Sequence, residues 1–267
     1  MKKRIITGVC LTALIFLAIF ILNTPLFALF CGLVLLIGAW EWLSFSNYFS
    51  TFFKINLIIL MILLMLASWF YLSWVIPIGV FIWVLAIVLI LIPMTASQFL
   101  KRPFYLALFA FCILIPAWAG IVFLHSEPNH WGVIYILMIS VLADTGAYFS
   151  GKFFGKHKMA PQVSPKKTLE GAFGGIVLAS VLSSLFFEFL GQTSRASFWD
   201  FLLISIGLVF VSIFGDLFES LLKRHCGVKD SGNILPGHGG VLDRIDSVIA
   251  ILPVFACIEI SGRFFGA

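Results

Sequence analysis

The chain has 267 residues, of which 61% are hydrophobic and only 11% are charged, with a mean hydropathy of +1.12. Soluble globular domains carry about 25% charged residues, so this composition excludes a soluble domain. Apolar runs of about 20 residues recur along the whole length, and each is long enough to cross a bilayer as a helix. We therefore predict an all-α polytopic membrane protein.

About nine transmembrane helices are expected, with no long linker that would separate a second domain. We treat residues 1–267 as a single integral membrane domain. Basic residues precede the first apolar run, but it reaches Asn23-Thr24-Pro25 without a small-residue cleavage site, which indicates an uncleaved helix. The predicted helices cover residues 5–22, 25–45, 55–73, 75–93, 104–124, 131–149, 171–191, 198–222 and 245–262.

The distribution of basic residues predicts the orientation of these helices. With the N-terminus placed in the cytoplasm, 15 of the 17 Lys and Arg residues fall on the cytoplasmic side, and only Arg195 and Arg263 fall outside. Such an excess is typical of cytoplasmic loops. We expect a cytoplasmic N-terminus and a C-terminus on the opposite side. The same distribution accounts for the net charge of +5, so nucleic acid is not expected as a partner.

Residues 1–125 have the composition of scaffold helices, with Phe, Leu and Ile for lipid-facing surfaces. Glu41 is the exception, because it is an acid at the cytoplasmic end of the second helix. An interfacial carboxylate that reaches the membrane surface is the interpretation that we favour, and a functional acid is the alternative.

Residues 131–262 contain the side chains and glycines expected of a site. Asp144 lies about one and a half turns before the predicted end of the sixth helix, where an ionisable group usually faces a cavity, a cation or a partner. Gly146, Gly151 and Gly155 follow it and permit close helix packing or a turn.

The next loop contains Ser164-Pro165-Lys166-Lys167-Thr168 and leads into the seventh helix. It can be an ordinary connector in which Ser164 or Thr168 caps that helix. It can also be an anion-binding turn, since the free amides at a helix start and two lysines suit a phosphate. The two interpretations are compatible.

The eighth helix places four polar residues on one face near its cytoplasmic end. Asp216, Glu219, Ser220 and Lys223 are three or four residues apart. Asp216 and Lys223 could neutralise one another. The topology, however, also brings Asp144 and the acids at positions 243 and 246 to this face, and such a group repels unless a cation lies among them. Hard oxygen ligands favour Mg²⁺.

A glycine-rich loop separates the eighth and ninth helices. Its glycines allow backbone amides to approach an anion closely, although many turns use glycine for other reasons. The basic residues Lys229, His238 and Arg244 strengthen the prediction that this loop binds an anion. Asp243 and Asp246 lie in the first turns of the ninth helix. His238 can be a turn residue, a phosphate donor or an acid/base group.

These residues resemble the signature of the phosphatidate cytidylyltransferases, also called CDP-diacylglycerol synthases. The resemblance covers about the C-terminal half of the chain, whereas the N-terminal helices match only in type. It rests on Ala143 to Tyr148, Ser164 to Thr168, Ser220, Lys223-Arg224, Lys229-Asp230, Gly232, Pro236, His238-Gly239-Gly240, Asp243-Arg244 and Asp246.

The resemblance implies that CTP and phosphatidate give CDP-diacylglycerol and pyrophosphate, with one or two Mg²⁺ ions. The metal ligands would be Asp144, Asp216, Asp243 and Asp246. The catalytic residues would be Asp216, Asp243, Asp246, Lys223 and Arg244. The substrate-binding residues would be Ser164, Lys167, Thr168, Ser220, Arg224, Lys229, Asp230, His238, Gly239 and Gly240.

The resemblance also implies a homodimer in contact with membrane lipids. We expect a bacterial inner-membrane protein whose site faces the cytoplasm. A secondary transporter would place its carboxylates near the bilayer midplane, and a CDP-alcohol phosphotransferase would contain a D-G-x-x-A-R pattern that this sequence lacks. A CTP-dependent polyprenol or lipid kinase is the main alternative.

Overall fold

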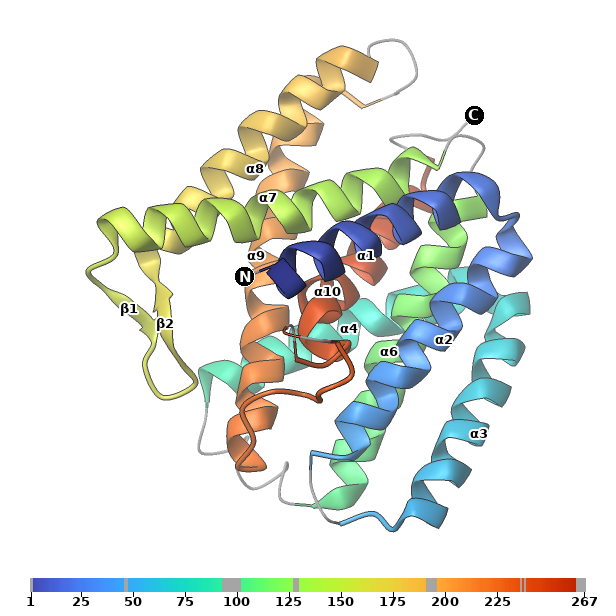
Figure 1. The fold of residues 1–267 in the computed structure, drawn as a ribbon. Helices are drawn as coiled ribbons and strands as arrows, with labels where there is room; N and C mark the ends of the chain where they lie inside the picture. Colours follow the sequence, from blue (N-terminus) through green and yellow to red (C-terminus); the bar gives the residue numbers. More distant parts are fainter. Residues whose placement is uncertain are drawn as a thin grey trace.

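The computed structural model describes residues 2–45, 48–92, 102–126, 130–190, 196–235, 237 and 239–262. Within them, helices are the main elements, and a helix lies in each of the nine predicted segments (Figure 1). The α-helices are α1 (Lys2–Ile21), α2 (Thr24–Leu43), α3 (Thr51–Ser68), α4 (Leu72–Leu91), α6 (Pro103–Ser126), α7 (Trp131–Phe154), α8 (Leu169–Leu190), α9 (Phe198–His225) and α10 (Leu242–Glu259). The short helix η1 (Trp69–Tyr71) joins α3 and α4, and the strands are β1 (Lys158–Ala160) and β2 (Ser164–Thr168).

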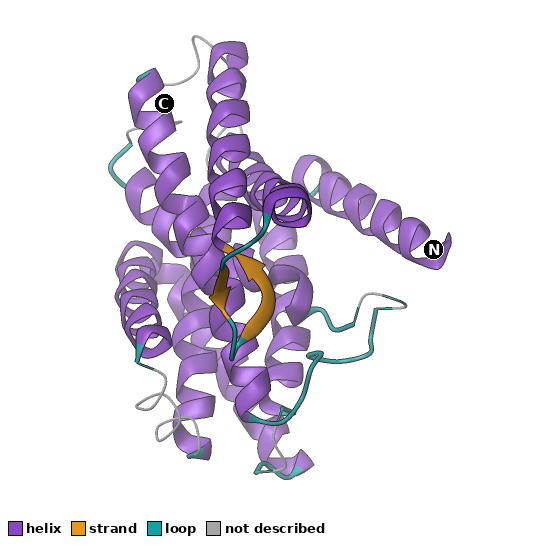
Figure 2. Cartoon of the chain, turned by 90° about the vertical axis from the view of Figure 1, so that its left-hand side faces the viewer, coloured by secondary structure: helices purple, strands orange, loops and turns teal. Residues whose placement is uncertain are grey.

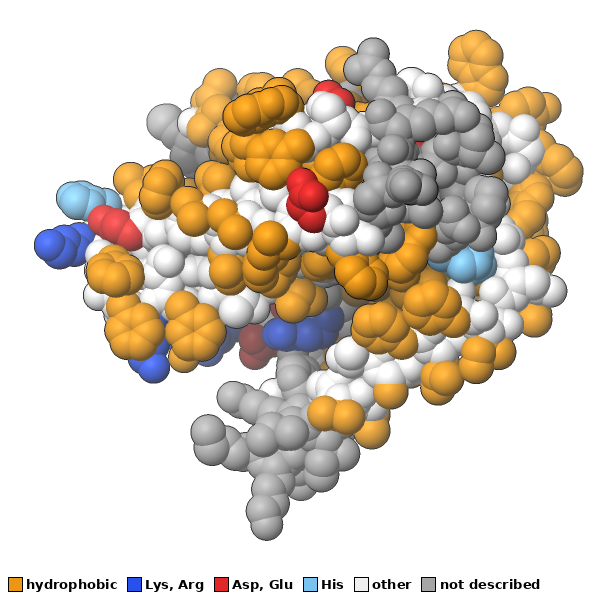
Figure 3. All heavy atoms as spheres, turned by 90° about the horizontal axis from the view of Figure 1, so that it is seen from above, with side chains coloured by type: hydrophobic (Ala, Val, Ile, Leu, Met, Phe, Trp, Pro, Cys, Tyr) orange, Lys and Arg blue, Asp and Glu red, His pale blue; other side chains and the backbone are white. Residues whose placement is uncertain are grey.

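Six stretches of the described residues are long and apolar enough to cross a membrane, and the longest, Thr51–Leu91, includes both α3 and α4. The helical, membrane-type fold is therefore confirmed, while the count of nine spans and the sides of the two termini stay predictions. Figure 3 shows hydrophobic side chains over most of the described surface on one face, with Lys and Arg visible only at the left and in the lower middle of the view.

Local sequence signals explain several helix starts. The Asn23 side chain accepts a hydrogen bond from the Leu26 amide at 3.1 Å at the start of α2. Ser50 caps α3 through the Phe53 amide at 3.3 Å. Ser197 and Asp200 form a reciprocal capping box at the start of α9. Each cap satisfies an amide that has no partner inside the helix.

The chain between α7 and α8 differs from the prediction in two ways. Helix α7 ends at Phe154, five residues beyond the predicted boundary at residue 149, so Asp144 is ten residues from its end. The loop after it contains an antiparallel hairpin, in which Lys158 pairs with Thr168 and Ala160 with Ser164 (Figure 2). Strands this short give almost no alternating hydrophobic pattern, which is why the sequence did not predict them.

Helices α7 and α8 approach one another closely through glycine, which is one of the two roles that the sequence allowed for Gly146. A Cβ atom on Gly146 would lie 2.6 Å from the carbonyl oxygen of Gly174. A Cβ on Gly175 would lie 2.7 Å from the carbonyl oxygen of Ala143. Small residues allow backbones to pack at this distance in a membrane, and the contact fixes Asp144 relative to the hairpin and α8.

The N-terminal helices pack against α9 through aromatic rings. Phe218 of α9 is 1% exposed, and its ring centroid lies 6.3 Å from that of Trp42 in α2, 5.9 Å from Trp83 in α4 and 5.5 Å from Phe109 in α6. Each of two of these rings adjoins a buried acid in the sequence: Glu219 follows Phe218, and Glu41 precedes Trp42. The scaffold half therefore directly determines where the polar residues of α9 lie.

Candidate active site

A polar cavity of about 560 Å³ lies between α7, the hairpin, and helices α8, α9 and α10. Residues from these five segments and from the loop before α10, where Asp230 lies, line it, so only the folded chain forms it. Of the residues predicted for the site, it brings together Asp144, Ser164, Lys167, Thr168, Asp216, Lys223, Asp230, Asp243, Arg244 and Asp246.

Acids on three helices line this cavity. Asp144 comes from α7, Asp216 from α9 and Asp246 from α10. Asp216 forms an ion pair with Lys167 of the hairpin at 2.7 Å, and it accepts a hydrogen bond from the Ser220 hydroxyl at 3.3 Å. The convergence of acids that the sequence predicted is therefore present in the structure.

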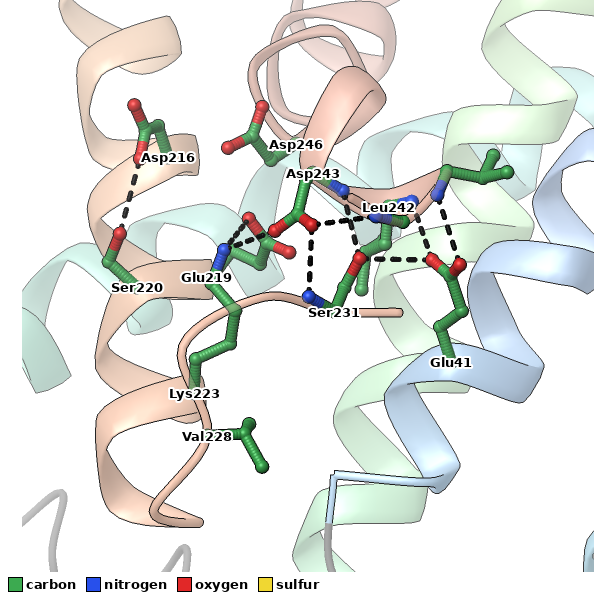
Figure 4. A network of polar contacts seen from close by, with 12 residues as sticks. Glu41, Asp216, Glu219, Ser220, Lys223, Val228, Ser231, Leu242, Asp243 and Asp246 are labelled. Carbon is green, nitrogen blue, oxygen red and sulfur yellow. Dashed lines mark hydrogen bonds and ion pairs between the residues drawn. The ribbon is translucent and has the colours of Figure 1, made fainter. Parts of the chain in front are cut away.

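Lys223 does not pair with Asp216, which corrects one alternative from the sequence. Its ammonium group donates to Glu219 at 2.9 Å and to Asp243 at 2.5 Å. Lys223 is only 8% exposed, and Figure 4 shows it reaching from α9 to the start of α10. In this position the ammonium group neutralises the buried carboxylate of Glu219 and the half-buried carboxylate of Asp243, and it connects α9 to α10.

Asp243 is the centre of a hydrogen-bond network at the start of α10 (Figure 4). One oxygen accepts from Lys223, and the other accepts from the Ser231 and Gly240 amides, both at 2.9 Å. Burial alone would raise the pKa of this carboxyl, but the hydrogen bonds from Lys223 and the two amides lower it below its usual value. Asp243 is therefore an ionised anchor for the loop.

The hairpin and the start of α8 are joined by side-chain caps. The Thr168 hydroxyl accepts from the Gly171 amide at 3.1 Å, which confirms the predicted N-cap. Glu170 accepts from the backbone amides of Lys156 at 3.1 Å and His157 at 3.2 Å, and it pairs with the His157 ring at 2.6 Å. These contacts hold the hairpin so that Lys166 and Lys167 line the cavity.

Other predicted residues lie apart from the cavity lining. Arg224 is exposed and donates to the carbonyl oxygens of Val163 and Val228, each at 3.4 Å. Lys229 is exposed in the loop. Gly239 has φ +84°, where a side chain would be strained. His238 and Pro236 lie outside the described residues, as do Arg195 and Arg263.

The glycine-rich loop brings its amides to carboxylates of the protein itself. Gly240 and Ser231 donate to Asp243, and the Val241 and Leu242 amides donate to Glu41 at 3.0 and 2.8 Å. Phosphate binding by Gly239 and Gly240 stays a prediction. Glu41 is 3% exposed, so the interfacial interpretation of this residue is wrong. Glycines before a helix start favour an anionic partner, but that signal could not identify Glu41.

The oxygen donors around the cavity fit Mg²⁺ chemically. Glu219 Oε1 is buried and has no N–H or hydroxyl donor among the described residues, and the Asp246 carboxyl lies against Glu219. Lys223 donates to the other oxygen of Glu219, so the approach of Asp246 to the Oε1 side favours a proton or a cation there. No group of three His, Cys, Asp or Glu residues in the described part of the chain is arranged to hold a metal. Mg²⁺ commonly uses one or two carboxylates together with substrate phosphates, so this arrangement suits it.

Comparisons with known proteins agree with one another. The family model described as the cytidylyltransferase family matches residues 2–260. A phosphatidate cytidylyltransferase of Pseudomonas aeruginosa is 42% identical over 263 residues, covering 97% of this chain and 96% of the relative. One of Haemophilus influenzae is 37% identical over 280 residues, covering 96% and 97%. One of Staphylococcus epidermidis is 48% identical over 149 residues, covering 54% and 56%.

Proposed function

The chain belongs to the cytidylyltransferase family, and from this membership we propose that it transfers a cytidylyl group from CTP to phosphatidate. The products are CDP-diacylglycerol and pyrophosphate. The observation that carries the proposal is the match to two curated phosphatidate cytidylyltransferases over nearly the whole of both chains. It makes the protein a nucleotidyltransferase of phospholipid biosynthesis.

The reaction needs no nucleophilic side chain. An oxygen of the phosphatidate phosphomonoester is already anionic and forms the new bond to the α-phosphorus of CTP. The bond from that phosphorus to the bridging oxygen breaks, and pyrophosphate leaves with the electron pair. The main obstacle is the repulsion between two polyanions, so positioning and charge neutralisation are what the protein must supply.

Basic side chains of the cavity perform this neutralisation in our proposal. Lys166, Lys167 and Arg244 come from the hairpin and from the start of α10. They approach a bound phosphate from two sides. Lys167 is held by Asp216 at 2.7 Å, which fixes its direction before substrate binds. Both partners are partly exposed to the cavity, with 23% and 31% of their side-chain surface accessible, so substrate oxygens can reach the ammonium group.

Asp144, Asp216 and Asp246 are the candidate ligands, of which one or two would hold Mg²⁺ together with substrate phosphates. The ion would neutralise phosphate charge. Asp243 was also predicted as a ligand, but its oxygens accept hydrogen bonds from Lys223, Ser231 and Gly240. We therefore assign Asp243 to holding the loop and keep the other three acids as candidates for the cation.

The site faces the cytoplasm in this proposal. The distribution of Lys and Arg along the sequence supports that orientation. CTP then enters from water, while the acyl chains of phosphatidate stay among lipids. The clustering of the acids and bases in one cavity, between α7, the hairpin and α10, is consistent with such a site.

Purified protein incubated with phosphatidate, CTP labelled at the α-phosphate and Mg²⁺ tests the proposal. We expect labelled CDP-diacylglycerol and one pyrophosphate for each product, and no turnover with a chelator present. A lipid kinase would instead release CDP and leave the lipid without the α-phosphate label. Formation of CDP alone, or of no labelled lipid in several detergents and lipid mixtures, would refute the proposal.

A further inference from the structure

Glu41 is a buried acid far from the catalytic half of the sequence. It lies on α2 and is 3% exposed. Its carboxylate accepts hydrogen bonds from the Ser231 hydroxyl at 3.0 Å, the Val241 amide at 3.0 Å and the Leu242 amide at 2.8 Å. Within the described residues no Lys or Arg forms an ion pair with it. The negative charge is instead balanced by the N-terminus of α10, where unpaired amides favour an anion.

Two glycines of the loop enclose this carboxylate. A Cβ atom on Gly232 would lie 2.5 Å from Glu41 Oε1, and a Cβ on Gly240 would lie 2.5 Å from Glu41 Oε2. Any larger residue at either position would displace the carboxylate or the loop. The loop is therefore shaped around Glu41, which explains why glycine occurs at both positions.

A second set of hydrogen bonds connects Glu41 to the cavity (Figure 4). The Ser231 hydroxyl that donates to Glu41 also accepts from the Asp243 amide at 3.2 Å, and the Ser231 amide donates to Asp243 at 2.9 Å. Asp243 in turn accepts from Lys223. Arg244 and Asp246 follow within the first turns of α10 and line the cavity.

We propose that Glu41 is a positioning residue for cytidylyl transfer, which caps α10 and fixes the loop so that Arg244 and Asp246 face the cavity. Glu41 itself does not line the cavity, so it acts through those two residues. The inference rests on the proposed function. It gives the N-terminal helices a specific part in the reaction beyond anchoring the protein in lipid.

Glu41→Gln tests the proposal because it keeps the shape of the side chain. Its amide group would turn one acceptor oxygen into a donor that faces other donors. We expect kcat to fall by about ten-fold or more, since a small displacement of reacting groups is costly. We also expect faster amide hydrogen exchange in residues 227–246, with exchange in α7 unchanged. Glu188→Gln, at an exposed position on α8, is the matched control and should leave both measurements at wild-type values.

The outcomes separate this inference from the proposed function. Wild-type kcat in Glu41→Gln, or faster exchange throughout the helices, would overturn the positioning role. An inactive wild-type protein would refute the proposed function, while the exchange measurement would still test whether Glu41 holds the loop. If Glu41→Gln does not accumulate in the membrane, Ser231→Ala takes its place, because it removes only one hydroxyl of the network. It must show the same local exchange and a smaller fall in kcat, and wild-type behaviour would overturn the proposal.

Discussion

Replacing Lys223 by Met should destabilise the protein strongly, because it removes the cation that, among the described residues, pairs with both Glu219 and Asp243. Met retains most of the apolar stem, so the change mainly deletes the charge. The side chain of Glu219 is 2% exposed and that of Asp243 is 9% exposed, so water can solvate neither carboxylate well. Removal of one partner from such a buried pair costs about 3–5 kcal/mol.

The decrease in the free energy of unfolding can be measured by equilibrium unfolding of the purified protein in mixed detergent and SDS micelles. Lys158→Met, at an exposed position of the hairpin, is the matched control and should change the free energy of unfolding by about 0.5 kcal/mol or less. A second variant separates charge from packing. Adding Glu219→Gln to Lys223→Met removes one of the two uncompensated charges, so the double variant should recover about 1–3 kcal/mol.

Two results would refute this reasoning. A loss of less than about 1 kcal/mol in Lys223→Met would mean that water or a cation compensates the two acids. A double variant less stable than Lys223→Met alone would mean that packing, and not charge, determines the cost. In either case Lys223 would again be a candidate catalytic residue, the role that the sequence analysis predicted for it.

Three further predictions concern other parts of the site. Asp216→Asn should abolish turnover in the assay with labelled CTP while membrane insertion stays normal, and unchanged turnover would remove Asp216 from the set of metal ligands. Thr168→Val should lower the free energy of unfolding by about 0.5–2 kcal/mol through loss of the Gly171 cap, whereas Thr168→Ser should restore it; equal stability of the two variants would contradict the cap. Gly146→Leu should separate α7 from α8, because even a Cβ would lie 2.6 Å from a carbonyl oxygen, and should reduce the yield of folded protein in a detergent-resistance assay; normal yield would show that the two helices can shift apart at little cost.

The position of Glu41 shows where sequence analysis loses information. Its neighbours in the sequence are apolar or aromatic, and they indicate only a helix end near the membrane surface. Its hydrogen-bond partners are about 190–201 residues away along the chain. No local sequence pattern indicates a contact between residues so far apart in the chain. The same limit applies to Lys223, for which the sequence suggested Asp216 as a partner but could not indicate Glu219 and Asp243.

The sequence by itself determined the helical membrane-type fold, the approximate bounds of the helices and most of the polar residues that line the cavity. Apolar runs, and the charged residues that interrupt them, are local properties that can be read directly from the sequence. Only the tertiary structure decided which acid meets which base, that a hairpin carries Lys167 to Asp216, and that the glycine-rich loop encloses a carboxylate of α2. Those pairings depend on how α2, α9 and α10 pack together, and packing joins residues that are distant in the sequence.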